Sequence, residues 1–143
     1  MPVGIQRPAS VPLKTLVVED DFTSRLLLQT FLARYGECHV AVDGKEAVKA
    51  FQIASDHGSP YNLVCMDILL PTMNGTEAVK QIRKLQESRG IPSARAAKII
   101  MTTGVSDMNE VFRSFDQSCD AYLFKPIDTA KLLKELEIFG LLE

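Results

Sequence analysis

The chain contains 143 residues, of which 46% are hydrophobic and 24% are charged, and its 18 acidic and 16 basic side chains give a net charge of −2. This length and composition suit one globular domain with a sizeable core. The near-neutral charge argues against a nucleic-acid binder that relies on bulk positive charge, and no apolar run approaches the roughly 20 residues that a membrane-spanning helix needs.

The predicted elements begin after a short leader. Residues 1–13 carry three prolines and no hydrophobic periodicity, which predicts a flexible leader and places one domain over residues 14–143. From Lys14 onward, short apolar runs that predict strands alternate with amphipathic stretches that predict helices. We expect strands at residues 15–18, 39–42, 62–66, 98–102 and 121–124. We expect helices at about residues 22–35, 47–54, 76–88, 105–118 and 128–139.

Five strand–helix units in strict alternation indicate the fold class. The predicted strands are continuous apolar runs, so both faces of each strand must be covered, as in a parallel sheet of the α/β class. Five units are too few for an eight-fold barrel. The sequence therefore predicts a doubly wound open sheet of five parallel strands.

Acidic side chains follow two of the predicted strands. Glu19 and Asp20 come directly after the first strand and Asp67 after the third. In a doubly wound sheet, ligands bind beyond the carboxyl ends of the strands, so the three carboxylates share one crevice if these strands are neighbours. Two like charges ~4 Å apart repel by about 4 kcal/mol at an effective dielectric of ~20. Either a proton or a cation must therefore lie among them, and Mg²⁺, which also binds phosphate oxygens, fits best.

A lysine and a hydroxyl complete this set. Lys125 follows the fifth predicted strand and lies about 10 Å from Asp67 across two strand spacings, which an extended lysine side chain can largely bridge. Thr103 adds a hydroxyl between them. Acids, hydroxyl and lysine around a metal suit phosphoryl transfer to a carboxylate, where the protein positions groups and neutralises charge.

Other polar residues have structural explanations. Asp21 and Asp43 fit helix caps or turns, and Thr102 fits packing within the sheet. His39 and His57 have no partner at metal-ligand spacing and are interpreted as bystanders.

The cysteines indicate the cellular compartment. The chain has three, Cys38, Cys65 and Cys119, far apart in the sequence. They fit neither a disulfide framework nor a zinc site, and they favour a reducing, cytoplasmic location.

Taken in order along the chain, these residues resemble the receiver domain of response regulators in two-component signalling. The resemblance covers about residues 14–139 and implies a flavodoxin-like (βα)5 fold with strand order 2-1-3-4-5. It rests on four segments: LVVEDD at 16–21, MDILLPTMNG at 66–75, IIMTTG at 99–104 and AYLFKP at 121–126.

The resemblance implies a role for each acid. Asp67 corresponds to the phosphoacceptor, Asp20 to the direct metal ligand and Glu19 to its acidic partner. The backbone carbonyl of Leu69 corresponds to a further metal ligand. The implied cofactor is Mg²⁺, for which Mn²⁺ or Ca²⁺ could substitute.

The resemblance also implies a switch. Lys125 corresponds to the lysine that contacts the phosphoryl group, Thr103 to the switch hydroxyl, and Tyr122 to the aromatic residue that turns inward when the threonine moves. It further implies a cis Lys125–Pro126 bond, which only about 5–6% of X–Pro bonds adopt.

Some positions depart from the usual receiver pattern. Gly104 stands where alanine is more usual, which leaves access to the phosphoryl group open. Leu69 and Val105 occupy the two positions that help to set the rate of self-dephosphorylation. Both side chains are apolar and cannot orient an attacking water, so we expect a long-lived phosphate on Asp67. The connection over residues 89–97 is longer than in minimal receivers and resembles receivers attached to hybrid kinases.

The implied function is phosphorylation by a sensor histidine kinase or a histidine phosphotransfer protein. The signal would pass to a separate effector through the face formed by the fourth helix, fifth strand and fifth helix. We expect no nucleic-acid binding, no membrane insertion and no enzymatic activity beyond the domain's own phosphorylation and dephosphorylation. Because the chain begins with Met1 and ends soon after the last helix, we expect a free-standing receiver.

Alternatives from the sequence remain. The chain could be the receiver fragment of a hybrid sensor kinase, or a receiver-like interaction module that acts without phosphorylation. A Mg²⁺-dependent phosphohydrolase with an aspartyl-phosphate intermediate needs a second acid two residues after the nucleophile, and Leu69 stands there instead. A nucleotide-binding sheet would need a glycine-rich loop after the first strand, which is absent.

Overall fold

Regular strands and helices follow the predicted alternation. The computed structural model describes residues 12–104 and 118–142. Its strands are β1 (Leu13–Val18), β2 (Gly36–Ala41), β3 (Leu63–Asp67), β4 (Lys98–Thr103) and β5 (Ala121–Phe124). Its helices are α1 (Phe22–Leu32), α2 (Gly44–Asp56), α3 (Gly75–Ser88), α5 (Thr129–Ile138) and the short 3-10 helix η1 (Ser93–Arg95). The helix expected over residues 105–118 lies almost wholly outside the described residues.

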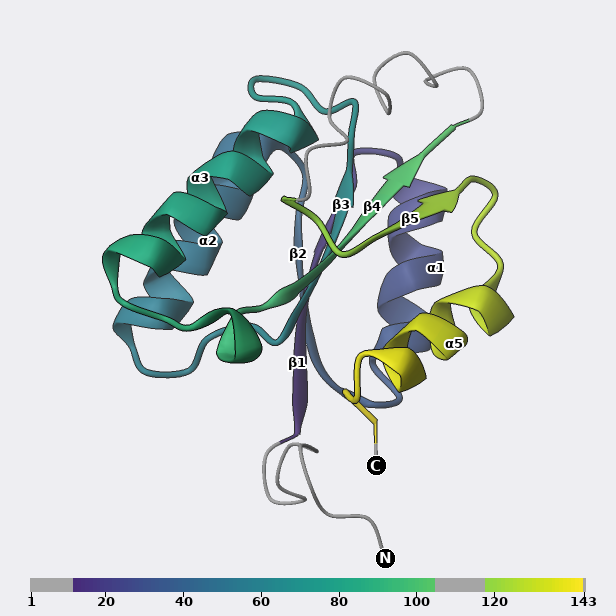
Figure 1. The fold of residues 1–143 in the computed structure, drawn as a ribbon. Helices are drawn as coiled ribbons and strands as arrows, with labels where there is room; N and C mark the ends of the chain where they lie inside the picture. Colours follow the sequence, from purple (N-terminus) through teal and green to yellow (C-terminus); the bar gives the residue numbers. More distant parts are fainter. Residues whose placement is uncertain (1–11, 105–117, 143) are drawn as a thin grey trace, which may run out of the picture.

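The strands form one parallel sheet in the order β2-β1-β3-β4-β5 (Figure 1), which confirms the predicted topology. Strand order reverses at β1, which pairs with β2 on one side and β3 on the other. The chain leaves β1 for α1 on one face and leaves β3 for α3 on the opposite face (Figure 1). These two loops therefore diverge at the carboxyl edge of the sheet, where a crevice can form.

Two apolar cores lie on the two faces of the sheet. Helices α2 and α3 cover one face, and α1 and α5 cover the other (Figure 1). Successive strand residues point to opposite faces, so Leu16 and Val18 pack on the α2–α3 side while Leu13 and Val17 pack on the α1–α5 side. Burial on both faces explains why the central strands are continuous apolar runs.

The β1–α1–β2 region differs from the expected bounds. Helix α1 ends at Leu32 and β2 begins at Gly36, each three residues earlier than the sequence pattern predicts. Gly36 pairs with Leu13 in the sheet, and a Cβ atom at this glycine would lie 1.8 Å from the Leu13 carbonyl oxygen. The glycine therefore allows close strand pairing and does not mark a helix end. β1 also begins at Leu13, two residues earlier than expected, and that side chain is fully buried.

Side-chain caps fix where the helices begin. Asp21, Asp43, Asn74 and Asp128 each accept a hydrogen bond from a backbone N–H in the first turn of α1, α2, α3 and α5. Such a cap typically stabilises a protein by about 1 kcal/mol. The cap interpretation of Asp21 and Asp43 is thereby confirmed, which separates both residues from the other acids at this edge of the sheet.

Gly75 opens α3 directly against the strand that carries Asp67. Its N–H donates to the Ile68 carbonyl at 2.7 Å. A Cβ atom at this position would lie 2.0 Å from the Asp67 carbonyl oxygen. The absence of a side chain thus sets how closely α3 approaches the end of β3.

We expect Gly75→Ala to lower the free energy of unfolding by about 2–4 kcal/mol, because the backbone of β3 or α3 must move to admit the methyl group. Gly90→Ala is the matched control. Gly90 has a φ of 69° and open space around it, so alanine there should cost only about 1 kcal/mol of backbone strain. Urea unfolding measures both variants, and an equal or smaller loss for Gly75→Ala would contradict the close contact.

Candidate functional site

The candidate residues meet at the carboxyl edge of the sheet. Glu19 and Asp20 follow β1, Asp67 ends β3, Thr103 ends β4 and Lys125 follows β5. Backbone hydrogen bonds continue the sheet pairing past the strand ends: Glu19 N donates to the Ala41 carbonyl at 3.1 Å, and Lys125 N donates to the Thr103 carbonyl at 2.7 Å. These bonds fix the backbone of Glu19 and Lys125 relative to the ends of the neighbouring strands.

Three carboxylates form one cluster. One oxygen from each of Glu19, Asp20 and Asp67 lies within 4.8 Å of the other two. Glu19 is fully buried and Asp67 is 4% exposed, whereas Asp20 is exposed. The cluster therefore has a buried floor of two carboxylates and an open rim at Asp20.

Lys125 reaches across to the two buried carboxylates. Its Nζ atom lies 2.9 Å from Glu19 Oε1 and donates a hydrogen bond to Asp67 Oδ2 at 3.0 Å. The side chain thus spans the gap between the end of β5 and the end of β3, as the sequence predicts. The Lys125–Pro126 peptide bond is cis, which confirms that expectation.

The Lys125 ammonium does not by itself neutralise the buried carboxylates of Glu19 and Asp67. Burial raises the pKa of Asp67, and the adjacent Glu19 carboxylate raises it further; Lys125 offsets only part of this, and the pKa reaches about 7. Burial lowers the pKa of Lys125, but Glu19 and Asp67 outweigh that effect and raise its pKa above the ordinary value. The site accordingly favours an additional positive charge beside Asp67.

The donor set fits a hard divalent cation. It consists of carboxylate oxygens from Glu19, Asp20 and Asp67. Glu19 and Asp67 are buried and only partly neutralised by the Lys125 ammonium, and Asp20 is exposed beside them. Mg²⁺ prefers oxygen ligands and commonly keeps several waters, which an open rim permits.

Arg25 and Gly75 support the site, although the sequence analysis assigns neither of them a role there. Arg25, in the first turns of α1, donates from Nη1 to the Glu19 carbonyl at 2.9 Å. The backbone N–H of Asp21 donates to Glu19 Oε2 at 3.1 Å, which holds the buried carboxylate from its other side. Gly75 packs against the Asp67 carbonyl. These contacts depend on the path of the loops, which no residue spacing revealed.

The remaining candidates differ in burial. Thr103 is fully buried, and its hydroxyl donates to the Gly104 carbonyl at 3.3 Å. Tyr122 on β5 is partly buried and packs against the core on the α2–α3 side. Leu69, two residues after Asp67, is 49% exposed. Val105 lies outside the described residues.

The residues that the sequence analysis assigned to packing or to no functional role lie outside the acidic cluster. Thr102 is buried within the sheet, as expected. Cys65 is buried on the α1–α5 side of the sheet, and burial raises the pKa of its thiol to about 12. His39 and His57 line a separate pocket.

Across residues 12–104 and 118–142, no helix is both long enough and apolar enough to span a bilayer.

The sequence is similar to those of known proteins over most of the chain. The regulatory protein VanRB of Enterococcus faecalis is 35% identical over 127 residues, which cover 87% of this chain and 51% of that protein. Hybrid signal transduction histidine kinase I of Dictyostelium discoideum is 31% identical over 137 residues, covering 94% of this chain and 8% of that protein. The chain thus spans about half of one relative and a small part of the other.

Solved structures show the same fold. A co-crystal structure of the Saccharomyces cerevisiae phosphotransfer protein Ypd1 with the receiver domain of Ssk1 matches with a TM-score of 0.72 and 29% identity, over 91% of this chain and 90% of the other. A CheY-like receiver domain protein from Methanospirillum hungatei matches with a TM-score of 0.70 and 26% identity, over 90% and 94%.

The family model of the response regulator receiver domain matches residues 15–137, a span that begins in β1 and ends in α5. With the acidic cluster, the facing lysine and the 2-1-3-4-5 sheet in place, this match shows that the chain belongs to the response regulator receiver domains of two-component signalling.

Proposed function

We propose that Asp67 accepts a phosphoryl group from a phosphohistidine, carried by a sensor histidine kinase or a histidine phosphotransfer protein. The observation that carries this proposal is the Lys125 ammonium, which lies about equally close to the buried carboxylates of Glu19 and Asp67. The Ssk1 receiver was crystallised with such a phosphotransfer protein, which supports the same kind of donor here.

Asp67 is suited to the transfer by its position and its charge. A carboxylate oxygen of Asp67 attacks the phosphorus atom as the bond from phosphorus to the donor imidazole nitrogen breaks, and the imidazole leaves with that electron pair. Lys125 is placed to neutralise negative charge on the transferred oxygens. Positioning and charge neutralisation account for most of the catalysis in this class of reaction.

We further propose that the acidic cluster holds Mg²⁺, for which Mn²⁺ or Ca²⁺ can substitute. Asp20 and Asp67 would bind it directly, with Glu19 as the acidic partner and the Leu69 backbone carbonyl as a further ligand. When bound, the cation supplies charge neutralisation for the phosphoryl oxygens.

Thr103 and Tyr122 are proposed to convert phosphorylation into a change of shape. The Thr103 hydroxyl bonds only weakly, at 3.3 Å, to the neighbouring Gly104 carbonyl, so a phosphoryl oxygen on Asp67 offers it a stronger acceptor. Movement of Thr103 shifts the end of β4, and Tyr122 on the adjacent strand then fills the vacated space. Phosphorylation thus favours one of two conformations through contacts that only the phosphorylated protein makes.

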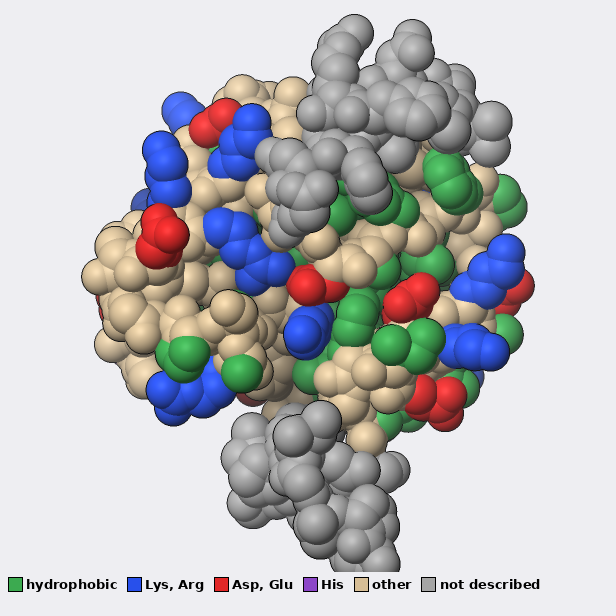
Figure 2. All heavy atoms as spheres, viewed as in Figure 1, with side chains coloured by type: hydrophobic (Ala, Val, Ile, Leu, Met, Phe, Trp, Pro, Cys, Tyr) green, Lys and Arg blue, Asp and Glu red, His purple; other side chains and the backbone are tan. Residues whose placement is uncertain are grey.

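An effector surface would read this change. Phe124 on β5, which pairs with Thr103 in the sheet, is 45% exposed, and Ile138 in the last turn of α5 is 67% exposed, so both elements leave apolar side chains uncovered. Figure 2 shows hydrophobic side chains on the side of the molecule where α1, β5 and α5 lie. We propose that a separate protein docks on the surface that includes β5 and α5, and that this signalling takes place in the cytoplasm without any other enzymatic activity.

Incubation with Mg²⁺ and acetyl phosphate should add one phosphoryl group to the protein, detected by intact mass. Asp67→Ala should abolish the gain. Asp43→Asn is the matched control, because Asp43 is an acid at the same edge that caps α2, and asparagine caps equally well. No gain with acetyl phosphate or with phosphorylated kinase would contradict the proposal and favour an interaction module that acts without phosphorylation.

Mg²⁺ should stabilise the folded protein, because the unfolded chain lacks the cluster. At about 100 times its dissociation constant, the ion should raise the free energy of unfolding by about 2.7 kcal/mol. Asp20→Asn should remove most of this gain. Asp21→Asn should keep it, because Asp21 caps α1. Thermal unfolding with Mg²⁺ and with a chelator gives the comparison, and equal effects of the two substitutions would count against Asp20 as a ligand.

The phosphate on Asp67 should be long-lived, because the apolar side chains at Leu69 and Val105 cannot orient an attacking water. We expect Leu69→Asn combined with Val105→Glu to speed dephosphorylation by roughly tenfold or more. The decay of the phosphorylated mass after removal of the phosphodonor measures the rate. If the double variant decays no faster than the original chain, these two positions do not set the lifetime.

A further inference from the structure

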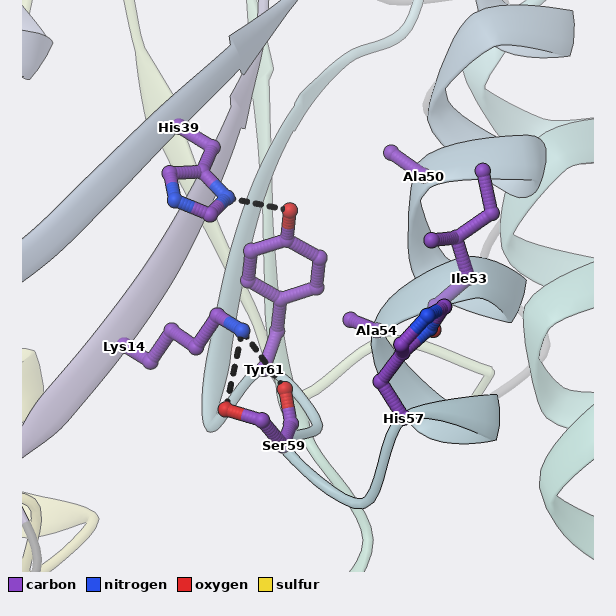
Figure 3. A pocket seen from close by; sticks show the side chains of 8 residues that line it. All are labelled: Lys14, His39, Ala50, Ile53, Ala54, His57, Ser59 and Tyr61. Carbon is purple, nitrogen blue, oxygen red and sulfur yellow. Dashed lines mark hydrogen bonds between the residues drawn. The ribbon is translucent and has the colours of Figure 1, made fainter.

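A pocket of about 390 Å³ (Figure 3) lies near the start of β1 and the end of α2, away from the acidic cluster at the carboxyl edge of the sheet. We call it the β2–α2 pocket. Its walls come from β2, the second half of α2, the start of β1 and the connection between α2 and β3. Volumes from about 300 Å³ upward are typical of small-molecule sites, so this pocket suits a compact ligand.

One side of the β2–α2 pocket is aliphatic and the other is aromatic. Ala50, Ile53 and Ala54 of α2 face the ring of Tyr61 across the space in Figure 3. Ile53 is 48% exposed, so the aliphatic side is not fully covered by the protein's own core. Tyr61 is 5% exposed and Ala54 8%, so the apolar surface that water contacts here lies mainly on Ile53, and an apolar group placed over it would bury that surface.

The aromatic side is held in place by hydrogen bonds. His39 Nε2 lies 2.6 Å from Glu37 Oε2, and His39 Nδ1 lies 2.7 Å from the Tyr61 hydroxyl. With Nε2–H donating to the carboxylate, Nδ1 accepts from Tyr61. The His39 and Tyr61 rings also pack edge to face at 5.4 Å. A side fixed in this way loses little side-chain freedom when a ligand binds.

Lys14 gives the β2–α2 pocket a positively charged side chain that can pair with an anion, and its other titratable side chains are His39, His57 and Tyr61. Among the residues described, no acid lines the pocket, and the nearby Glu37 carboxylate is hydrogen-bonded to His39. The Lys14 ammonium lies 5.0 Å from the centre of the Tyr61 ring and donates to the carbonyl and hydroxyl oxygens of Ser59. Two of its three N–H donors are thereby used, and the third remains for a ligand.

We propose that the β2–α2 pocket binds a small aromatic carboxylate. The ring would cover Ile53 beside the largely buried ring of Tyr61, and the carboxylate would accept a hydrogen bond from Lys14. The pocket is remote from Asp67, so this site is independent of the proposed phosphoryl transfer.

The test uses 2-naphthoate, with 2-naphthamide as a neutral molecule of the same shape. Each is titrated into the unphosphorylated protein labelled with ¹⁵N, and amide shifts are followed by NMR. We expect 2-naphthoate to shift the amides of Lys14, Ile53 and Ser59 and their neighbours. Lys14→Met should weaken 2-naphthoate about fivefold, the effect of losing one exposed ion pair, and leave 2-naphthamide unchanged.

Lys98→Met is the matched control, because Lys98, like Lys14, lies at the start of a strand and over an aromatic ring, that of Phe139 at 5.7 Å, outside this pocket. It should leave the affinity for 2-naphthoate unchanged. Ala50→Leu should weaken both compounds by filling the pocket, while the spectrum confirms that the variant is folded. Shifts that map elsewhere, equal binding of the acid and the amide, or equal effects of the two lysine substitutions would overturn the proposal.

Discussion

The confinement of two carboxylates in one buried crevice is the constraint on which the site depends. Glu19 and Asp67 are withdrawn from water and share a single ammonium, from Lys125. Burying a charge costs several kcal/mol unless it is paired, and here two negative charges share one positive partner. The protein keeps this unfavourable arrangement at the sheet edge, where an added cation would relieve the repulsion between the two carboxylates, as the proposed phosphoryl transfer requires.

The fold places these charges without any irregular strand. Parallel pairing brings the ends of β1 and β3 side by side, and the reversal of strand order separates the loops that follow them. Lys125 arrives from the far edge because the β4–β5 pairing continues to its own backbone N–H. The chemistry of the site therefore follows from sheet topology together with side-chain length.

Much of this could be predicted from the sequence, because strand ends and acids are local signals. The acidic cluster followed from Glu19, Asp20 and Asp67 coming directly after apolar runs. The early start of β2 could not be predicted from the same pattern, since a glycine after a helix resembles a helix end, and only its contact with Leu13 shows otherwise. The hydrogen bond from Arg25 to the Glu19 carbonyl could not be predicted either, because it depends on where α1 places this side chain relative to the loop backbone.

The contact between Gly75 and the Asp67 carbonyl has a mechanical consequence. There is no space for even a methyl group at Gly75, so the backbones of β3 and α3 cannot come closer together at their junction. A displacement of Asp67 toward α3 would meet backbone, which is stiff, whereas the Thr103 hydroxyl on the other side makes one long hydrogen bond, to the Gly104 carbonyl. The backbone beside Asp67 is thus closely packed on the α3 side, while the Thr103 side chain is only weakly held on the other, and this asymmetry would direct a response to the proposed phosphorylation toward β4 and β5.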